Sequence, residues 1–297
     1  MSVNTEISES FRLIQDEICL ALEQCDGGAV FVEDLWERPG GGGGRTRVFR
    51  NGNVIEKGGV NFSAVYGECS DALKQQMHTQ AANFFATGVS IVLHPNNPHV
   101  PIIHMNIRHF ALSDGTSWYG GGIDLTPHYI DRSQASWFHS QLESVCDRFS
   151  PDYYPKFKSW ADDYFYLPHR NETRGVGGIF FDDLGREEQS SESYKDFVLE
   201  IGRSFAPIYT HLMNLNRDRS FSTQEKMWQQ LRRGRYVEFN LVHDRGTRFG
   251  LLTNGRTESI LMSLPATASW EYDFTPEEGS REQETIDLLV KGVSWVG

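Results

Sequence analysis

Cysteine is scarce in this chain, with only four residues, at positions 19, 25, 69 and 146, among 297. None of them forms a C-x-x-C pair or the paired spacing of a zinc site. The sequence therefore argues against a disulfide framework and against an iron–sulfur cluster, and reduced thiols are expected. Long apolar runs are also lacking. Because a spanning helix needs about 18 apolar residues or more, we expect no membrane span.

Basic residues are outnumbered, since 28 Lys and Arg stand against 40 Asp and Glu, and the net charge is -12. Nucleic-acid binding needs a basic face, so we expect no nucleic acid partner. A small anionic ligand stays compatible with this charge if a few arginines gather locally. The first 24 residues lack the apolar core of a signal peptide, and they are acidic rather than Arg-rich and acid-poor like a transit peptide. On this basis we expect a cytoplasmic protein.

Several catalytic motifs are missing. The five-glycine run at 40–44 is not followed by the G-K-[ST] of a phosphate-binding loop, and G-x-S-x-G and H-E-x-x-H do not occur. GVGG at 175–178 lacks the third glycine of a dinucleotide fingerprint and precedes an expected strand. Nucleotide binding, serine hydrolysis and zincin chemistry therefore have little support.

Hydrophobic spacing predicts one α+β domain over residues 1–297, with a mostly antiparallel sheet covered by helices. It includes an N-terminal helix within 1–28, a flexible glycine-rich loop at 39–44 and a hairpin turn at Asn51–Gly52. The other helices are expected at 71–86, 133–149, around 157–164, at 191–217, after the capping box Ser222–Glu225, and at 280–292. The other strands are expected at 29–36, 88–95, 102–112, 117–125, 177–184, 235–244, 248–253 and 257–264, the last two joined at Asn254–Gly255.

The strand IIHMNIRHFAL carries the strongest site signal. Alternate residues of a strand share a face, so Ile103, Met105 and Ile107 lie on one side. His104, Asn106 and Arg108 lie on the other. This polar row offers a proton shuttle, an amide and a carboxylate clamp. A water-exposed strand is the alternative, although such strands more often carry Lys, Glu and Thr.

The stretch WYGGGIDLTP places three glycines, Gly120, Gly121 and Gly122, beside Asp124. Glycine weakens a strand and often marks the close approach of a ligand or of another backbone. Three glycines in a row beside Asp124 suggest a flat ligand lying on the sheet, and a bulge or a barrel corner is the structural alternative. Asp124 could instead cap the turn before Pro127.

Further polar residues fall near expected strand ends. They are Ser90, His94, His169, Arg256, Asp182 and Asp183. His94, His104, His139 and His169 could form a metal site, but they lack tight ligand spacing. The paired aspartates are expected to be hydrogen-bonded at a strand end.

Taken together, these motifs resemble the oxygen-dependent coproporphyrinogen III oxidase family. The matching stretches include AVFVEDLWERPGGGGGRTRVFRNG, GVSIVLHPNNPHVPIIHMNIRHF, WYGGGIDLTPHY, LPHRNETRGVGGIFFDDL and RRGRYVEFNLVHDRGTRFGLLTNGRTESILMSLP, within about 29–274. The resemblance implies haem biosynthesis: two propionates of coproporphyrinogen III become vinyl groups, CO₂ is released and O₂ is the oxidant. It implies no organic cofactor, a large, flat, mostly antiparallel sheet sandwiched between layers of helices, and a homodimer formed through about Tyr236 to Glu271. The oxygen-independent radical route needs C-x₃-C-x₂-C, which is absent.

The resemblance also implies roles for individual residues. Asp124 is the central carboxylate that accepts pyrrole N–H bonds or takes a proton, His104 a proton donor, and Arg108 a propionate clamp. The implied substrate-binding residues are Ser90, Asn106, Ile107, Arg108, Gly120, Gly121, Gly122, Asn254, Gly255 and Arg256. Members of bacterial type are described with a divalent metal on His94, His104, His139 and His169, whereas other members are regarded as metal-free. A tetrapyrrole-binding protein without catalysis and a histidine–metal hydrolase stay open as alternatives.

Overall fold

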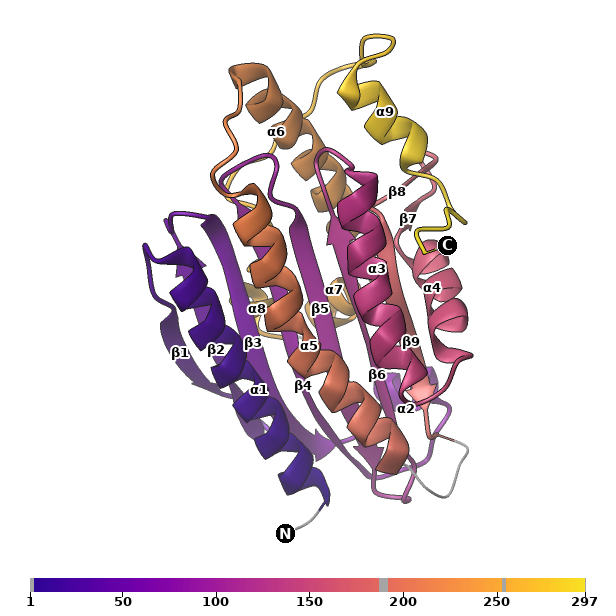
Figure 1. Ribbon diagram of the computed structural model, residues 1–297. Coiled ribbons are helices and arrows are strands. Elements are labelled where there is room, and N and C mark those ends of the chain that lie inside the picture. The colour runs from indigo at the N-terminus through magenta and orange to yellow at the C-terminus, as the bar shows by residue number, and fades with distance from the viewer. Residues whose placement is uncertain (1–2, 187–191, 253–254, 297) are drawn as a thin grey trace.

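A seven-stranded antiparallel sheet forms the centre of the computed structural model, which describes residues 3–186, 192–252 and 255–296 (Figure 1). In spatial order the strands are β1 (Val32–Glu37), β2 (Gly42–Arg50), β3 (Ile55–Glu68), β4 (Asn83–Pro95), β5 (Ile102–Leu112), β6 (Ser117–Thr126) and β9 (Gly177–Leu184). The first six lie in chain order, so each pairs with its sequence neighbour. The predicted antiparallel sheet is confirmed.

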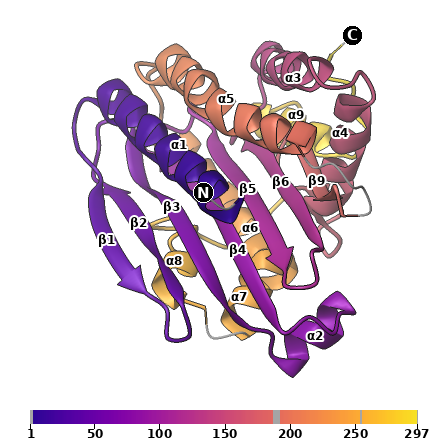
Figure 2. The ribbon, with the colours of Figure 1, turned by 90° about the horizontal axis from the view of Figure 1, so that it is seen from below.

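Helices cover both faces of this sheet, as Figure 2 shows. On one face lie α1 (Val3–Asp26), α3 (Arg132–Asp147) and α5 (Glu192–Asn216). On the other lie α6 (Thr223–Glu238), the π-helix η1 (Phe239–His243), α7 (Arg245–Leu252) and α8 (Thr257–Leu261). The remaining elements are α2 (Asp71–Met77), α4 (Tyr153–Tyr164), α9 (Arg281–Leu288) and the small pair β7 (Tyr166–Leu167) and β8 (Glu172–Thr173). The predicted α+β sandwich is thus present.

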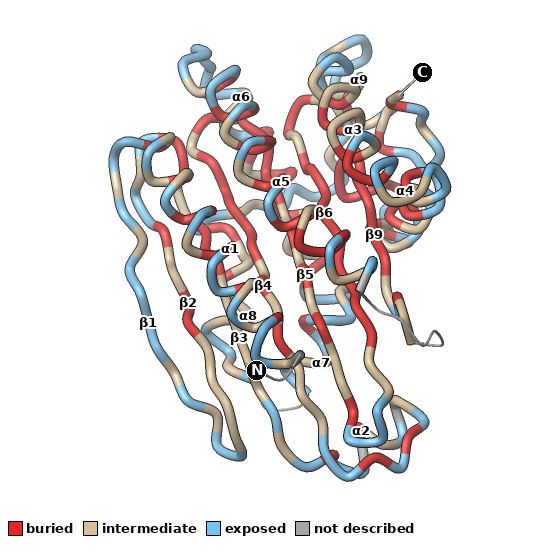
Figure 3. Tube along the Cα trace, turned by 60° about the horizontal axis from the view of Figure 1, so that its bottom comes forward, coloured by how far each residue is buried: buried red, intermediate tan, exposed pale blue. Residues whose placement is uncertain are grey.

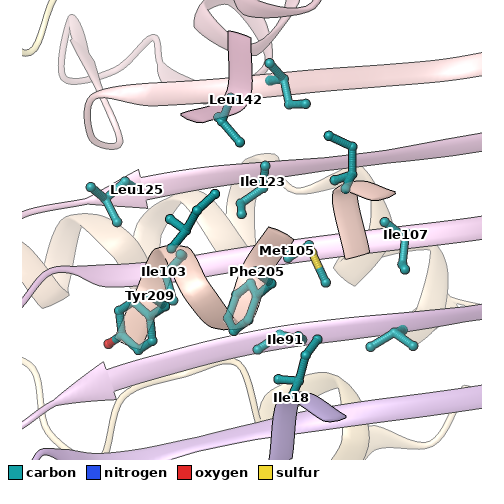
Figure 4. Close-up of a cluster of buried hydrophobic side chains, with 14 of the residues drawn as sticks. Ile18, Ile91, Ile103, Met105, Ile107, Ile123, Leu125, Leu142, Phe205 and Tyr209 are labelled. Atoms are coloured by element: carbon teal, nitrogen blue, oxygen red, sulfur yellow. The ribbon is translucent and has the colours of Figure 1, made fainter. Parts of the chain in front are cut away.

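The main core lies between the sheet and the layer of α1 and α5. Ile103, Met105 and Ile107 of β5 are fully buried there, together with Phe205 and Tyr209 of α5 (Figure 4). The intervening residues of β5 are only half-buried, so the predicted alternation is confirmed. Figure 3 shows burial concentrated in the central strands, whereas β1 at the edge is largely exposed.

The strands expected at 235–244, 248–253 and 257–264 are wrong, because this part of the chain forms α6, η1, α7 and α8. Buried Arg232, Tyr236, Phe239 and Asn240 follow helical spacing along α6 and η1. Short apolar runs fit either a strand or a helix, and periodicity alone did not separate the two here. The turn expected at Asn254–Gly255 falls partly outside the described residues, which exclude Asn254.

The helix expected at 71–86 is also shorter than predicted. It ends at Met77, where His78 adopts a left-handed conformation with φ 51°. Phe84 then lies in β4 and stacks on Phe110 of β5, with ring centroids 5.8 Å apart. The aromatic pair across the two strands outweighs the helical spacing that Phe84 shares with Met77.

The glycine-rich segment at 39–44 enters the sheet at Gly42 rather than ending as a loop. A Cβ on Gly42 would lie 2.2 Å from the carbonyl oxygen of Ala64, and one on Gly43 would lie 2.2 Å from that of Trp36. Only glycine therefore permits this spacing of β1, β2 and β3.

The hairpin between β2 and β3 is present, but its turn lies at Asn53 and Val54, because Gly52 N–H still bonds to the carbonyl of Ile55. The buried carboxylate of Asp26 accepts the backbone N–H groups of Asn53, Val54 and Ile55. These hydrogen bonds to Asp26, the last residue of α1, hold the turn at Asn53 and Val54 rather than at Asn51–Gly52.

Gly122→Ala is expected to destabilise the protein. Its Cβ would lie 2.7 Å from the carbonyl oxygen of Ile179, a backbone atom of β9 that cannot move without parting the strands. We expect a loss of about 1–3 kcal/mol in urea unfolding. The control Gly246→Ala, whose new Cβ first meets a side-chain atom of Asp244 at 3.3 Å, should leave stability unchanged or slightly higher. Equal stability of the two variants would show that β6 and β9 separate readily.

Candidate active site

The polar residues predicted on β5 and β6 face one another across the two strands. The register pairs His104 with Asp124, Asn106 with Gly122 and Arg108 with Gly120. Ser90 of β4 is the partner of Asn106 on the other side. The structure therefore gathers most of the predicted residues on the face of the sheet that carries α6, α7 and α8.

Asp124 forms a buried ion pair with Arg174, which precedes β9. Nη2 of Arg174 lies 2.7 Å from Oδ1 and 2.8 Å from Oδ2 of Asp124, and Nε lies 3.2 Å from Oδ2. The side chains are 1% and 2% exposed, so water scarcely screens the pair. Burial alone would raise the pKa of Asp124, but the charge of Arg174 and the hydrogen bond from His104 outweigh it and lower this pKa.

Aromatic rings enclose the guanidinium of Arg174. Its central carbon lies 4.4 Å from the ring centroid of Phe165, 4.5 Å from that of Phe239 and 4.8 Å from that of Tyr236. Nη1 donates to Oδ1 of Asn240 in η1 at 3.0 Å. Sequence reasoning missed Arg174, since only the pairing of β6 with β9 brings it to Asp124.

His104 links this buried charge to the half-buried polar face. Its Nδ1 lies 2.8 Å from Oδ1 of Asp124, and its side chain is 21% exposed. Because Asp124 is held ionised, Nδ1 donates, and this fixes the tautomer that leaves Nε2 for proton exchange. We expected the carboxylate of Asp124 to contact a ligand directly. It is not open to one, because its oxygens are occupied by Arg174 and His104.

Arg108 is held in place on the same face. Nη1 donates to Oδ1 of Asn106 at 2.9 Å, and Nη2 lies 2.7 Å from Oδ2 of Asp182. A Cβ on Gly120 would lie 2.7 Å from Nη2 of Arg108, so this glycine makes room for the guanidinium. Gly121 points to the opposite, core side, where a Cβ would lie 2.9 Å from the ring of Phe181.

Arg256, at the N-terminus of α8, marks the far end of this face. It forms an ion pair with Asp34 of β1 and lies over the ring of Trp36. Four strand spacings separate β1 from β5, which places this end about 19 Å from the strand of Arg108. Gly255 adjoins Arg256, whereas the side chain of Ile107 lies in the core and does not reach the polar face.

The four histidines expected as metal ligands are not brought together. Nε2 of His94 donates to the carbonyl of Ser263, and both ring nitrogens of His139 are bonded, to the hydroxyl of Tyr154 and to the carbonyl of Val176. Burial lowers the pKa of His94 to about 3 and that of His139 to about 4.

His169, the fourth of these histidines, pairs with Glu238 and His243, and His104 with Asp124. In the described part of the chain no three His, Cys, Asp or Glu side chains are grouped for a metal. The residues therefore do not fit a shared metal site.

This fold and site define a class of protein: a helix-covered antiparallel sheet that presents a carboxylate–histidine pair beside arginines, suited to acid–base chemistry on an anionic ligand. Residues 6–295 match the family model described as Coproporphyrinogen III oxidase. The chain belongs to this family.

Relatives of known function support this assignment. The chain is 49% identical over 310 residues to the chloroplastic oxygen-dependent coproporphyrinogen-III oxidase of Glycine max, covering 99% of this chain and 80% of that protein. It is 50% identical over 296 residues to the mitochondrial enzyme of Homo sapiens, covering 95% of this chain and 65% of that protein. It is 49% identical over 297 residues to the enzyme of Drosophila melanogaster, covering 95% of this chain and 76% of that protein.

The names of these relatives contradict the cytoplasmic location expected from the sequence, because the plant proteins are chloroplastic and the human protein is mitochondrial. The expectation rested on the acidic composition of the first residues, which carries no information about where a folded domain works. Among the described residues, none of the helices has both the length and the apolar character needed to cross a bilayer.

Asp124→Asn is expected to remove the counter-charge of Arg174 and to cost roughly 3–5 kcal/mol at pH 7. Since folding lowers the pKa of Asp124, its contribution is present above about pH 4 and is lost as pH falls further. Urea unfolding at pH 7 and pH 3 should therefore show a smaller difference between variant and wild type at pH 3. Asp163→Asn, at an exposed ion pair with Lys291, is the matched control and should cost little. Equal losses in both variants would contradict this role of Asp124.

Proposed function

We propose that this chain is an oxygen-dependent coproporphyrinogen III oxidase, an oxidoreductase of haem biosynthesis. It would convert two propionates of coproporphyrinogen III to vinyl groups with release of CO₂. The observation that carries the proposal is the Arg174–Asp124–His104 arrangement beside Arg108 on a glycine-lined face. Membership of the family and the names of the relatives point to the same reaction.

Substrate binding is assigned to the band of polar and glycine residues that crosses the sheet. The substrate is a non-planar ring of four pyrroles with four carboxylates at its rim. Arg108 on β5 and Arg256 beside β1, two strands that lie about 19 Å apart, would hold propionates at two sides of it. Ser90, Asn106, Gly120 and Gly122, which lie on the polar face, would lie beneath the ring. Two local arginines thus allow a chain with a charge of -12 to bind an anion.

Proton transfer is assigned to His104 rather than directly to Asp124. Each decarboxylation balances as a propionate plus O₂ and one proton giving a vinyl group, CO₂ and H₂O₂. The substrate C–H bond supplies the electrons, so O₂ is the co-reactant and no organic cofactor enters the balance. His104 would exchange the proton through Nε2, while Asp124 orients the ring and Arg174 keeps Asp124 ionised.

The test is incubation with coproporphyrinogen III in air-saturated and in anaerobic buffer. We expect protoporphyrinogen IX only in air, with one O₂ consumed for each vinyl formed. Arg108→Ala should raise KM about tenfold or more because a charge-assisted bond is lost. Arg148→Ala, at an exposed ion pair with Glu200, is the matched control and should keep the wild-type KM.

The outcomes separate the alternatives. Binding of the tetrapyrrole without consumption of O₂ would show an inactive binding homologue. Product formation without O₂ that stops on chelation would support a metal-dependent activity and contradict the proposal.

Dimerisation is proposed through about Tyr236 to Glu271, as the family resemblance implies. Large apolar side chains are exposed on this segment and next to it: Leu241, Val242, Leu251, Leu252, Trp270 and Tyr272. Leu252 is 81% and Tyr272 99% exposed. Apolar surface gathered in this way is typical of a protein–protein interface.

Leu252→Glu is expected to shift the protein from dimer to monomer, because it places a charge in an apolar interface. Analytical ultracentrifugation across a concentration series measures the change. Leu215→Glu is the control, since Leu215 is 50% exposed on α5, away from the proposed interface. If the Leu252→Glu protein has the same mass as the wild type at every concentration, the proposed dimer interface is contradicted.

A further inference from the structure

A cavity of about 220 Å³ lies outside the proposed active site, between α6, β8 and α9. These elements lie at the top of the molecule in the view of Figure 1. The cavity is lined on α6 by residues from successive helical turns, including Trp228, Arg232 and Arg235. Arg232 precedes Asn240, which contacts the ion pair, by eight residues or about 12 Å of helix. The cavity is therefore close to the site but distinct from it.

One wall of this cavity is cationic. Arg170, Arg232 and Arg235 line it, and Glu172 is the one carboxylate among the lining residues. Glu238, beside the cavity, pairs with Arg170 and Arg235, and Glu172 pairs with Arg232. Three guanidinium groups thus share two carboxylates, which leaves an excess of one positive charge.

Arg232 is the most deeply buried guanidinium of this wall. Its side chain is 3% exposed, and its Nη1 donates to both carboxylate oxygens of Glu172, at 3.1 and 3.0 Å. Its Nε is buried without a hydrogen-bond partner. A buried guanidinium charge with one donor unsatisfied is costly, so an anion placed against this wall would stabilise it.

The opposite wall is apolar. Trp228, Leu231, Phe274 and Ile286 pack together there. An apolar cavity of about 150 Å³ is large enough to hold benzene, so this cavity has room for a ring and a short side chain. An apolar body with one negative charge matches both walls.

We propose that this cavity binds a small monocarboxylic acid with an aromatic or branched apolar body. The carboxylate lies against the guanidinium wall of Arg170, Arg232 and Arg235 and balances its excess charge. The ring or alkyl body packs against Trp228 and Ile286. The proposal needs no turnover and does not depend on the proposed reaction.

The experiment is a fluorine NMR titration of the whole protein with 4-fluorophenylacetate. The neutral isostere 4-fluorophenylacetamide tests the need for charge. Ile286→Trp fills the cavity and leaves its ion pairs intact, and Arg232→Gln removes one of the three positive charges of the wall. Arg108→Ala controls for binding of the same probe to the sheet face. We expect Ile286→Trp and Arg232→Gln each to weaken binding about tenfold or more, and Arg108→Ala to leave it unchanged.

Two results would overturn the proposal. One is equal binding of the acid and the amide. The other is wild-type affinity in Ile286→Trp, which would place the probe elsewhere. Loss of binding in Arg108→Ala alone would assign the probe to the sheet face and would likewise reject the cavity, while leaving the proposed function standing.

Discussion

The buried charge of Asp124 constrains the rest of the site. A carboxylate removed from water needs a partner with good geometry, and Arg174 supplies it with three short contacts. Arg174 in turn needs its own charge stabilised away from water, which the faces of Phe165, Tyr236 and Phe239 and the amide of Asn240 provide. A single carboxylate on β6 therefore determines how the segment before β9 and the π-helix must lie.

The three glycines of WYGGGIDLTP illustrate how one motif serves several physical needs. Gly120 leaves space for the guanidinium of Arg108, Gly121 for the ring of Phe181, and Gly122 for the backbone of β9. From sequence the run indicated a close approach by a ligand or a backbone, without a choice between them. The structure shows that protein groups occupy the space at all three positions. The glycines of β6 therefore serve the packing of the protein first, and any role beneath a ligand is secondary.

The polar face could be predicted because strand alternation is local. Ile103 is buried and His104 half-buried because neighbouring residues of a strand face opposite sides of the sheet, and this alternation can be read from the sequence. Arg174 could not be predicted in the same way, because its partner lies 50 residues away and is reached only through strand pairing. The prediction of strands in the C-terminal part failed for a related reason. Tyr236 and Phe239 fit a strand or a helix equally by spacing, and only their packing against Arg174 and β4 distinguishes the two.

Both arginines assigned to the substrate carry a carboxylate partner already, Asp182 for Arg108 and Asp34 for Arg256. These partners fix the orientation of each guanidinium before a ligand arrives, so little side-chain entropy is lost on binding. These carboxylates also reduce the positive potential near each arginine, so a small anion that contacts only one of them is attracted weakly. A ligand gains from both arginines at once only if its carboxylates span the distance between them. Selectivity for a wide polyanion over a small one would then follow from strand spacing more than from the strength of either contact.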